Sequence, residues 1–329
     1  MSSPFPFTWA QQQKGRALLP FCFLNLTCEC SSLLLYYECR FGQKQVTFTD
    51  PLPSDPSLQD PPLVPDAYGR IAPVPENPPK ESPVWGLADV IGIAFFAFIA
   101  IVLSEVFVAR IVHLLPHFRH APLLQLENKA AVLVPAQLVA YGLILVFIVV
   151  LLVHKYGIDF GVNLLKAIRW NAPSANSGMA FLAGGGGLAL VSLVLERLLN
   201  KWTPKSLPME HLFDSTTSAY LIAATGILAA PFMEELVFRG FLYPALARWT
   251  GRVVSIVVTG ALFAAIHQQQ LAHAWAPLLI LFVVGVTLTT VRALTGSLAA
   301  SVLVHMGYNT AIFTLMFIGT HGFHDFRPR

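Results

Sequence analysis

The sequence predicts an all-α fold, a polytopic transmembrane helical bundle of about seven spans with a short interfacial amphipathic helix. Two observations predict this class: the 329-residue chain is 55% hydrophobic, and only 12% of its residues are charged. Soluble domains carry about 25% charged residues, so half that value together with long apolar runs indicates an integral membrane protein. The net charge of +3, with no basic cluster, predicts no nucleic-acid partner.

Residues 1–84 differ in composition from the rest of the chain. The stretch 51–83 is rich in proline and acidic residues, which is typical of an extended, disordered linker. The segment 17–37 is moderately apolar, but it has polar interruptions and no clear cleavage site, so we predict a tail rather than a cleaved signal sequence. Four cysteines in this region match no zinc or redox spacing. They are Cys22, Cys28, Cys30 and Cys39.

The remainder, 85–320, is predicted to be the transmembrane domain, followed by a C-terminal tail at 321–329. A span needs about 20 predominantly apolar residues. Seven segments are candidates, of which 253–267 is shorter than this length: 87–108, 130–153, 178–199, 218–246, 253–267, 275–294 and 297–319.

Between the second and third spans, residues 156–170 are predicted to form the amphipathic helix. Apolar Phe160, Leu164, Leu165 and Ile168 alternate there with Lys166 and Arg169. This pattern is typical of a helix lying at the membrane interface, and Trp170 is predicted to anchor it at headgroup level.

The fourth span contains two carboxylates and a guanidinium, from Glu234, Glu235 and Arg239. Each costs roughly 2.5–3.5 kcal/mol at a helix centre, so such groups indicate a functional site or a polar contact between helices. Glu235 and Arg239 are four residues apart and can pair on one face of the helix. Glu234 lies about 100° further round, without a local cation. We therefore predict that Glu235 is structural and that Glu234 acts on water as a general base.

Two later segments supply further polar groups, in the patterns Phe263-x-x-x-His267 and His305-x-x-x-Asn309. Taken singly, a histidine at a helix end or an asparagine within a span is equally well explained by packing. Together with Glu234 they suit peptide hydrolysis, which needs a base for water and donors for the oxyanion. Glu234 and His267 would hold and deprotonate water, while His305 and Asn309 would donate to the oxyanion.

Other hydrolytic patterns and phosphate loops fit this chain less well. It has no H-E-x-x-H zincin helix and no G-x-S-x-G nucleophile turn. The glycines at 184–187 lie within a span and lack the Lys-Ser/Thr of a phosphate loop. They are therefore predicted to permit close helix packing or a local kink.

The three motifs, in this order, resemble the CAAX-processing and bacteriocin-processing (Abi) family of intramembrane proteases, which includes the type II CAAX prenyl endopeptidases. The resemblance covers about residues 215–320. It implies an intramembrane endopeptidase. The substrate would be a membrane-associated peptide or protein that is either lipidated or of bacteriocin type. It also implies catalytic roles for Glu234, His267, His305 and Asn309, and a bracing role for Glu235 and Arg239, with Phe263 beside them.

The resemblance leaves metal dependence open, and we predict no cofactor, because an asparagine is a poor zinc ligand but a good oxyanion donor. The alternative is a zinc site formed by Glu234, His267 and His305. We expect a multi-pass protein of a prokaryotic plasma membrane. Besides the substrate, membrane lipid is the expected partner. The sequence indicates no oligomeric state. Two alternative functions are a non-catalytic immunity or scaffold protein of the same fold and a proton-coupled transporter. The transporter would more typically show repeated halves, which are not visible here.

Overall fold

The computed structural model describes residues 82–116, 118–119, 129–204, 207–208, 212–213 and 215–325, together with the backbone of four short strands. The chain divides into two units, Met1–Val74 and Pro75–Arg329. In the first unit, β1 (Arg40–Phe41) pairs antiparallel with β2 (Lys44–Gln45), and β3 (Leu63–Pro65) with β4 (Ile71–Pro73). Apart from these strands, the predicted disordered linker lies outside the described residues, and so do the four cysteines.

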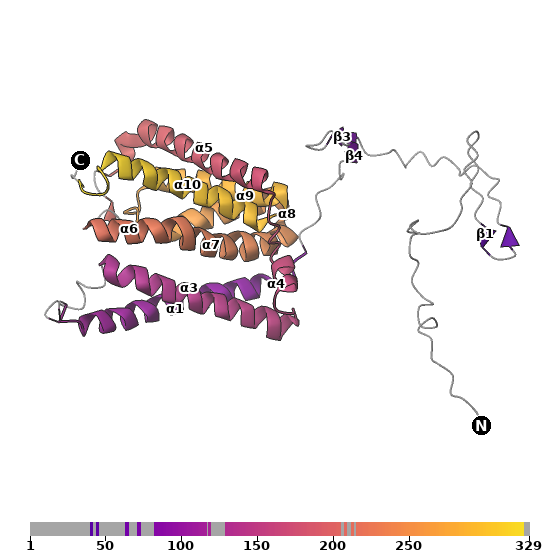
Figure 1. Cartoon of the computed structure of the whole chain (residues 1–329), viewed down its shortest axis with the longest axis horizontal. Helices are drawn as coiled ribbons and strands as arrows, with labels where there is room; N and C mark the ends of the chain where they lie inside the picture. The colour runs from indigo at the N-terminus through magenta and orange to yellow at the C-terminus, as the bar shows by residue number, and fades with distance from the viewer. Residues whose placement is uncertain are drawn as a thin grey trace, which may run out of the picture. The chain divides into compact units, whose positions relative to one another are not determined.

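In the second unit, the described regular elements are helices (Figure 1). Six helical segments are long and apolar enough to cross a membrane. They are α1 (Leu87–His113), α3 (Ala130–Val150) with the π-helix η1 (Leu151–Lys155), α5 (Ala175–Leu199) with the 3-10 helix η2 (Asn200–Trp202), the run Thr216–Ile266, α9 (Trp275–Thr295) and α10 (Leu298–Gly319).

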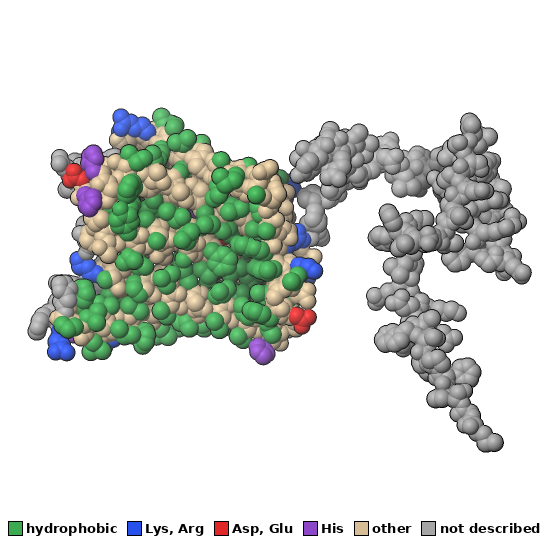
Figure 2. Space-filling model, viewed as in Figure 1, with side chains coloured by type: hydrophobic (Ala, Val, Ile, Leu, Met, Phe, Trp, Pro, Cys, Tyr) green, Lys and Arg blue, Asp and Glu red, His purple; other side chains and the backbone are tan. Residues whose placement is uncertain are grey.

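The surface of this unit fits a protein that crosses a membrane several times. Figure 2 shows apolar side chains covering its middle, with Lys, Arg, Asp, Glu and His gathered at its two ends. Charged groups avoid the hydrocarbon region because their transfer from water is costly. The predicted all-helical transmembrane fold is confirmed.

The run Thr216–Ile266 contains 51 residues. It consists of α6 (Thr216–Ala224), the π-helix η4 (Thr225–Ala229), α7 (Ala230–Glu235), the π-helix η5 (Leu236–Leu242) and α8 (Tyr243–Ile266). A straight helix of this length would measure about 77 Å, against about 30 Å for the hydrocarbon core of a bilayer. Gly251 interrupts α8 with φ 77° and ψ 174°, a conformation essentially restricted to glycine. The break falls between the predicted spans 218–246 and 253–267.

The predicted amphipathic helix is shorter than expected. α4 covers Val162–Ala167, six residues, and follows a turn at Gly161 with φ 101°. Ile168 is buried in the core, whereas Phe160 is 78% exposed. The half-buried ring of Trp170 meets Phe232 edge to face with centroids 5.7 Å apart, and its predicted role as a headgroup-level anchor stays a prediction.

Helix α10 is positioned by a very close contact with α5. A Cβ atom added at Gly185 would lie 2.0 Å from the Val304 carbonyl oxygen, and one added at Gly307 would lie 2.1 Å from that of Leu182. Only glycine permits such an approach of two backbones. Of the four glycines at 184–187, Gly185 alone lies at this contact, and the other three would meet nothing within 4 Å. The predicted packing role is therefore confirmed for one glycine of the run.

Candidate active site

The two glutamates lie between two π-helical segments. α7 is only six residues long, with η4 before it and η5 directly after Glu235. π-Helices are rare, and they are frequent at functional sites because the inserted residue changes the direction of the following side chains. Hydropathy gives no signal for this feature, so the sequence predicted an ordinary span.

Asn309 satisfies a backbone group that η4 leaves open. The Ala230 N–H bonds to the carbonyl of Thr225, five residues earlier. The next carbonyl, that of Gly226, would continue the pattern with residue 231, but Pro231 has no N–H. Instead, the Asn309 Nδ2 atom donates to the Gly226 oxygen at 2.6 Å. One N–H of this amide is therefore committed to the fold, and its second N–H is left for another acceptor.

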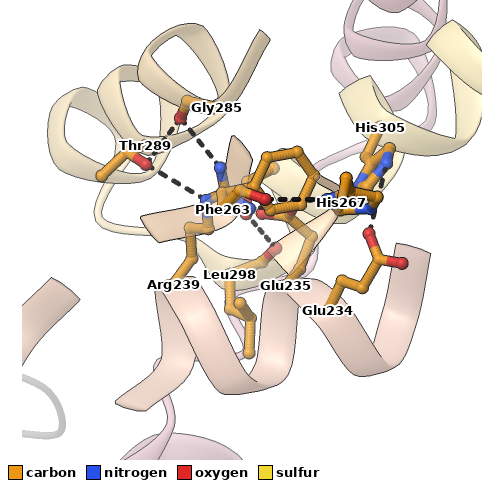
Figure 3. A network of polar contacts seen from close by, with 10 residues as sticks. Glu234, Glu235, Arg239, Phe263, His267, Gly285, Thr289, Leu298 and His305 are labelled. Atoms are coloured by element: carbon orange, nitrogen blue, oxygen red, sulfur yellow. Dashed lines mark hydrogen bonds and ion pairs between the residues drawn. The ribbon is translucent and has the colours of Figure 1, made fainter. Parts of the chain in front are cut away.

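The pair of Glu235 and Arg239 is fully buried and makes several hydrogen bonds (Figure 3). The Arg239 Nη1 atom lies 2.9 Å from Glu235 Oε1. The rest of the guanidinium donates to α9, from Nε to Thr289 Oγ1 at 3.1 Å and from Nη2 to the Gly285 oxygen at 2.8 Å. The (i, i+4) pairing expected from the spacing is present, whereas the contribution of Thr289 and Gly285 was missed because it depends on how α9 packs.

His305 connects the two glutamates. Its Nδ1 atom lies 2.9 Å from Glu235 Oε1, and its Nε2 atom lies 3.8 Å from Glu234 Oε2. The His305 side chain is 5% exposed and that of Glu234 is 21% exposed. Glu234 is thus the carboxylate of this cluster that water can reach. A separation of 3.8 Å is too long for a direct hydrogen bond. A water shared by the two groups would lie beside the line that joins them, because atoms bridged by one water are usually further apart.

Phe263 links the second histidine to this cluster. Its buried ring has centroid distances of 4.9 Å to His267 and 5.9 Å to His305, and the Arg239 guanidinium lies over it at 4.6 Å. The His267 Nδ1 atom donates to the Phe263 carbonyl oxygen at 2.7 Å. The F-x-x-x-H spacing therefore allows a hydrogen bond to the backbone one turn earlier, which fixes the orientation of the His267 imidazole.

These contacts determine which histidine nitrogens remain available. A carbonyl or carboxylate oxygen only accepts, so Nδ1 must be the protonated nitrogen of both His267 and His305. Each Nε2 is then an acceptor in the neutral ring and a donor only in the imidazolium. Neutral His267 and His305 can therefore accept protons from water, but they cannot donate to an oxyanion.

The alternative zinc site would be formed by Glu234, His267 and His305. Among the residues that the structure describes, no three His, Cys, Asp or Glu side chains are grouped so that they could hold a metal ion.

The comparison with protein families concerns this same part of the chain. Residues 216–311 match the family model described as type II CAAX prenyl endopeptidase Rce1-like. These residues are similar to an Rce1-like domain. The matched range runs from the start of α6 into α10 and includes every site residue named above. At the level of the family, the Rce1-like domain supports a CAAX-type intramembrane protease. Searches among curated proteins and among solved structures found no match.

Proposed function

We propose that this protein is an intramembrane endopeptidase that hydrolyses a peptide bond of a membrane-associated substrate, lipidated or of bacteriocin type. One observation carries the proposal: the accessible Glu234 carboxylate faces His305 Nε2 at 3.8 Å, and the other nitrogen of that imidazole is fixed by buried Glu235. A water molecule between these two acceptors would direct its protons at them and its lone pairs outward.

In the proposed reaction, Glu234 takes a proton from this water as its oxygen attacks the carbonyl carbon. His267 Nε2, also an acceptor in the neutral ring, is an alternative partner to His305 for the second proton of this water. The second Asn309 N–H donates to the oxyanion, while neutral His305 keeps the hydrogen bond from the remaining proton of the attacking oxygen. Glu234 then returns the proton to the leaving amine as the C–N bond breaks, so that the base is regenerated.

The test is cleavage by purified protein in liposomes containing a peptide library. The library combines peptides ending in prenylated cysteine motifs with unlipidated transmembrane peptides. Glu234→Gln is expected to lower kcat about 10²–10⁴-fold, the usual contribution of a general base. Its abundance should match wild type, because Glu235 and not Glu234 forms the buried ion pair. Glu196→Gln, which alters an exposed carboxylate on α5, is the matched control.

Equal cleavage by wild type and Glu234→Gln would refute the proposal. Loss of cleavage in a strong chelator, restored by zinc, would replace the glutamate mechanism with the zinc alternative. A library that neither form cleaves would favour the non-catalytic immunity or scaffold function.

A further inference from the structure

A cavity lined by two arginines lies outside the proposed active site, near the ends of several helices. Trp85 stands just before α1, and Arg292 lies in the last turn of α9. Pro244 lies about two turns before the break at Gly251. Arg169 follows α4, which lies at one end of the bundle (Figure 1). Because the ends of membrane-spanning helices lie near the lipid headgroups, the cavity is at the level of the lipid phosphates.

The cavity is small and positively charged. Its volume is about 40 Å³, which holds about three or four water molecules or one small anionic group. Arg292 is buried and Arg169 is half-buried, and the described residues that line the cavity include no carboxylate. A guanidinium can bind two phosphate oxygens with parallel hydrogen bonds, and this interaction is stronger where little water enters. The lining is therefore suited to a phosphate group.

The backbone brings the two arginines to the same turn. Arg169 has φ 56°, which is uncommon for a residue other than glycine. Its carbonyl oxygen accepts from the Leu298 N–H at 2.9 Å, at the start of α10. A Cβ atom added at Gly296 would lie 3.8 Å from Arg169 Nη1, and the Gly296 N–H donates to the Arg292 carbonyl oxygen at 3.0 Å. Both arginines are therefore fixed to the turn between α9 and α10.

The surface of α4 beside this charge is apolar. Phe160, Val162 and Leu165 are exposed, and Ala167 of the same helix lines the cavity. Apolar side chains at the membrane interface are buried among acyl chains. A free inorganic anion would use the arginines but would gain nothing from these side chains. The combination of a phosphate-sized charged cavity and an apolar surface therefore favours a lipid.

We infer that Arg169 and Arg292 bind the phosphate group of an anionic phospholipid, whose acyl chains lie along the exposed side of α4. Basic pockets between membrane helices attract anionic headgroups in this way. The bound lipid would hold α4 against the turn between α9 and α10. This inference is independent of the proposed function, because the binding is measured without a peptide substrate.

The experiment measures binding of dioctanoyl phosphatidylglycerol to the purified full-length chain in detergent, by native mass spectrometry. Dioctanoyl phosphatidylcholine is the zwitterionic comparison and should bind more weakly. Arg169→Gln is expected to weaken phosphatidylglycerol binding about 10–100-fold, through the loss of one charge-assisted interaction. Arg292→Gln should have a similar effect, and the half-buried Arg169 keeps the test valid if the buried variant does not fold. Arg252→Gln alters an exposed arginine of α8 and is the matched control.

Equal lipid binding by wild type and Arg169→Gln would overturn the inference. Displacement of the lipid by inorganic phosphate at equal concentration would show a site for a free anion instead. An unchanged lipid affinity in Arg169→Gln, with a KM raised only for peptides that have a free C-terminal carboxylate, would assign the cavity to the substrate. Lipid binding by Glu81→Gln but not by wild type would assign it to the chain's own carboxylate, since Glu81 directly precedes the lining residue Ser82. Each of these three results would replace the lipid as the occupant.

Discussion

The contact between α5 and α10 allows a prediction in which neighbouring glycines give opposite results. Gly185→Ala would place a Cβ atom 2.0 Å from the Val304 oxygen and 2.6 Å from the Tyr308 nitrogen, both backbone atoms within α10. Real Cβ contacts are essentially never below 3.0 Å, so the two helices must separate by about 1 Å. Gly184→Ala meets nothing within 4 Å and serves as the control.

Overpacking of this kind typically costs about 1–3 kcal/mol, and a backbone-to-backbone clash belongs at the upper end of the range. Gly184→Ala should instead gain up to about 1 kcal/mol from helix propensity. The two variants should therefore differ by about 2–4 kcal/mol in the free energy of unfolding. With an entropy of unfolding of about 2.1 cal/mol/K per residue, that corresponds to about 3–6 °C in Tm for a chain of this size. Thermal unfolding in one detergent, followed by circular dichroism, measures this difference.

The same displacement should reduce catalysis, because Val304 directly precedes His305. Gly185→Ala is therefore expected to lose peptide cleavage at temperatures where it is still folded, while Gly184→Ala retains it. Equal Tm values for the two variants would refute the packing argument. A stable but inactive Gly185→Ala would instead separate the position of α10 from the stability of the bundle.

Two further predictions concern the buried ion pair and the break in α8. Glu235→Gln removes the counter-ion of Arg239 and should cost about 3–5 kcal/mol, seen as low membrane abundance and a lowered Tm. Thr289→Val, which removes one neutral partner of the same guanidinium, should cost only about 1–3 kcal/mol, so equal losses would contradict the assignment. Gly251→Ala should cost about 1–3 kcal/mol through backbone strain alone, since nothing lies within 4 Å of the new Cβ. Gly142→Ala, also in open space but without a positive φ, is its control in the same unfolding assay, and matching Tm values would count against the strain.

Much of the fold could be predicted because lipid imposes a simple rule on composition. A hydrocarbon layer about 30 Å thick requires about 20 apolar residues in each span, and hydropathy detects these directly. The division of 216–266 could be placed near Gly251 because the polar stretch around it interrupts the apolar run. The π-helical segments could not be predicted, since they add one residue to a turn without changing its composition.

Contacts within one helix of the site could also be predicted from the sequence. Helical periodicity places Glu235 and Arg239 on one face, and the structure contains their ion pair at 2.9 Å. Contacts between helices that are far apart in the sequence could not be predicted. The bond from Asn309 to Gly226 depends on a carbonyl that η4 and Pro231 leave open together. The catalytic roles assigned to these side chains stay predictions.

The hydrogen bonds of the site explain why substitutions of two adjacent glutamates should have different effects on the fold and on catalysis. Glu235 Oε1 accepts from both Arg239 Nη1 and His305 Nδ1, each at 2.9 Å. The same oxygen therefore balances the buried charge and sets the direction of the imidazole. Arg239 is held in turn by α9, so the packing of α9 is transmitted through Glu235 to His305 Nε2. Glu234 stands outside these bonds and faces Nε2 at 3.8 Å. Loss of Glu235 should therefore disturb the fold and the site together, whereas loss of Glu234 should disturb the chemistry alone.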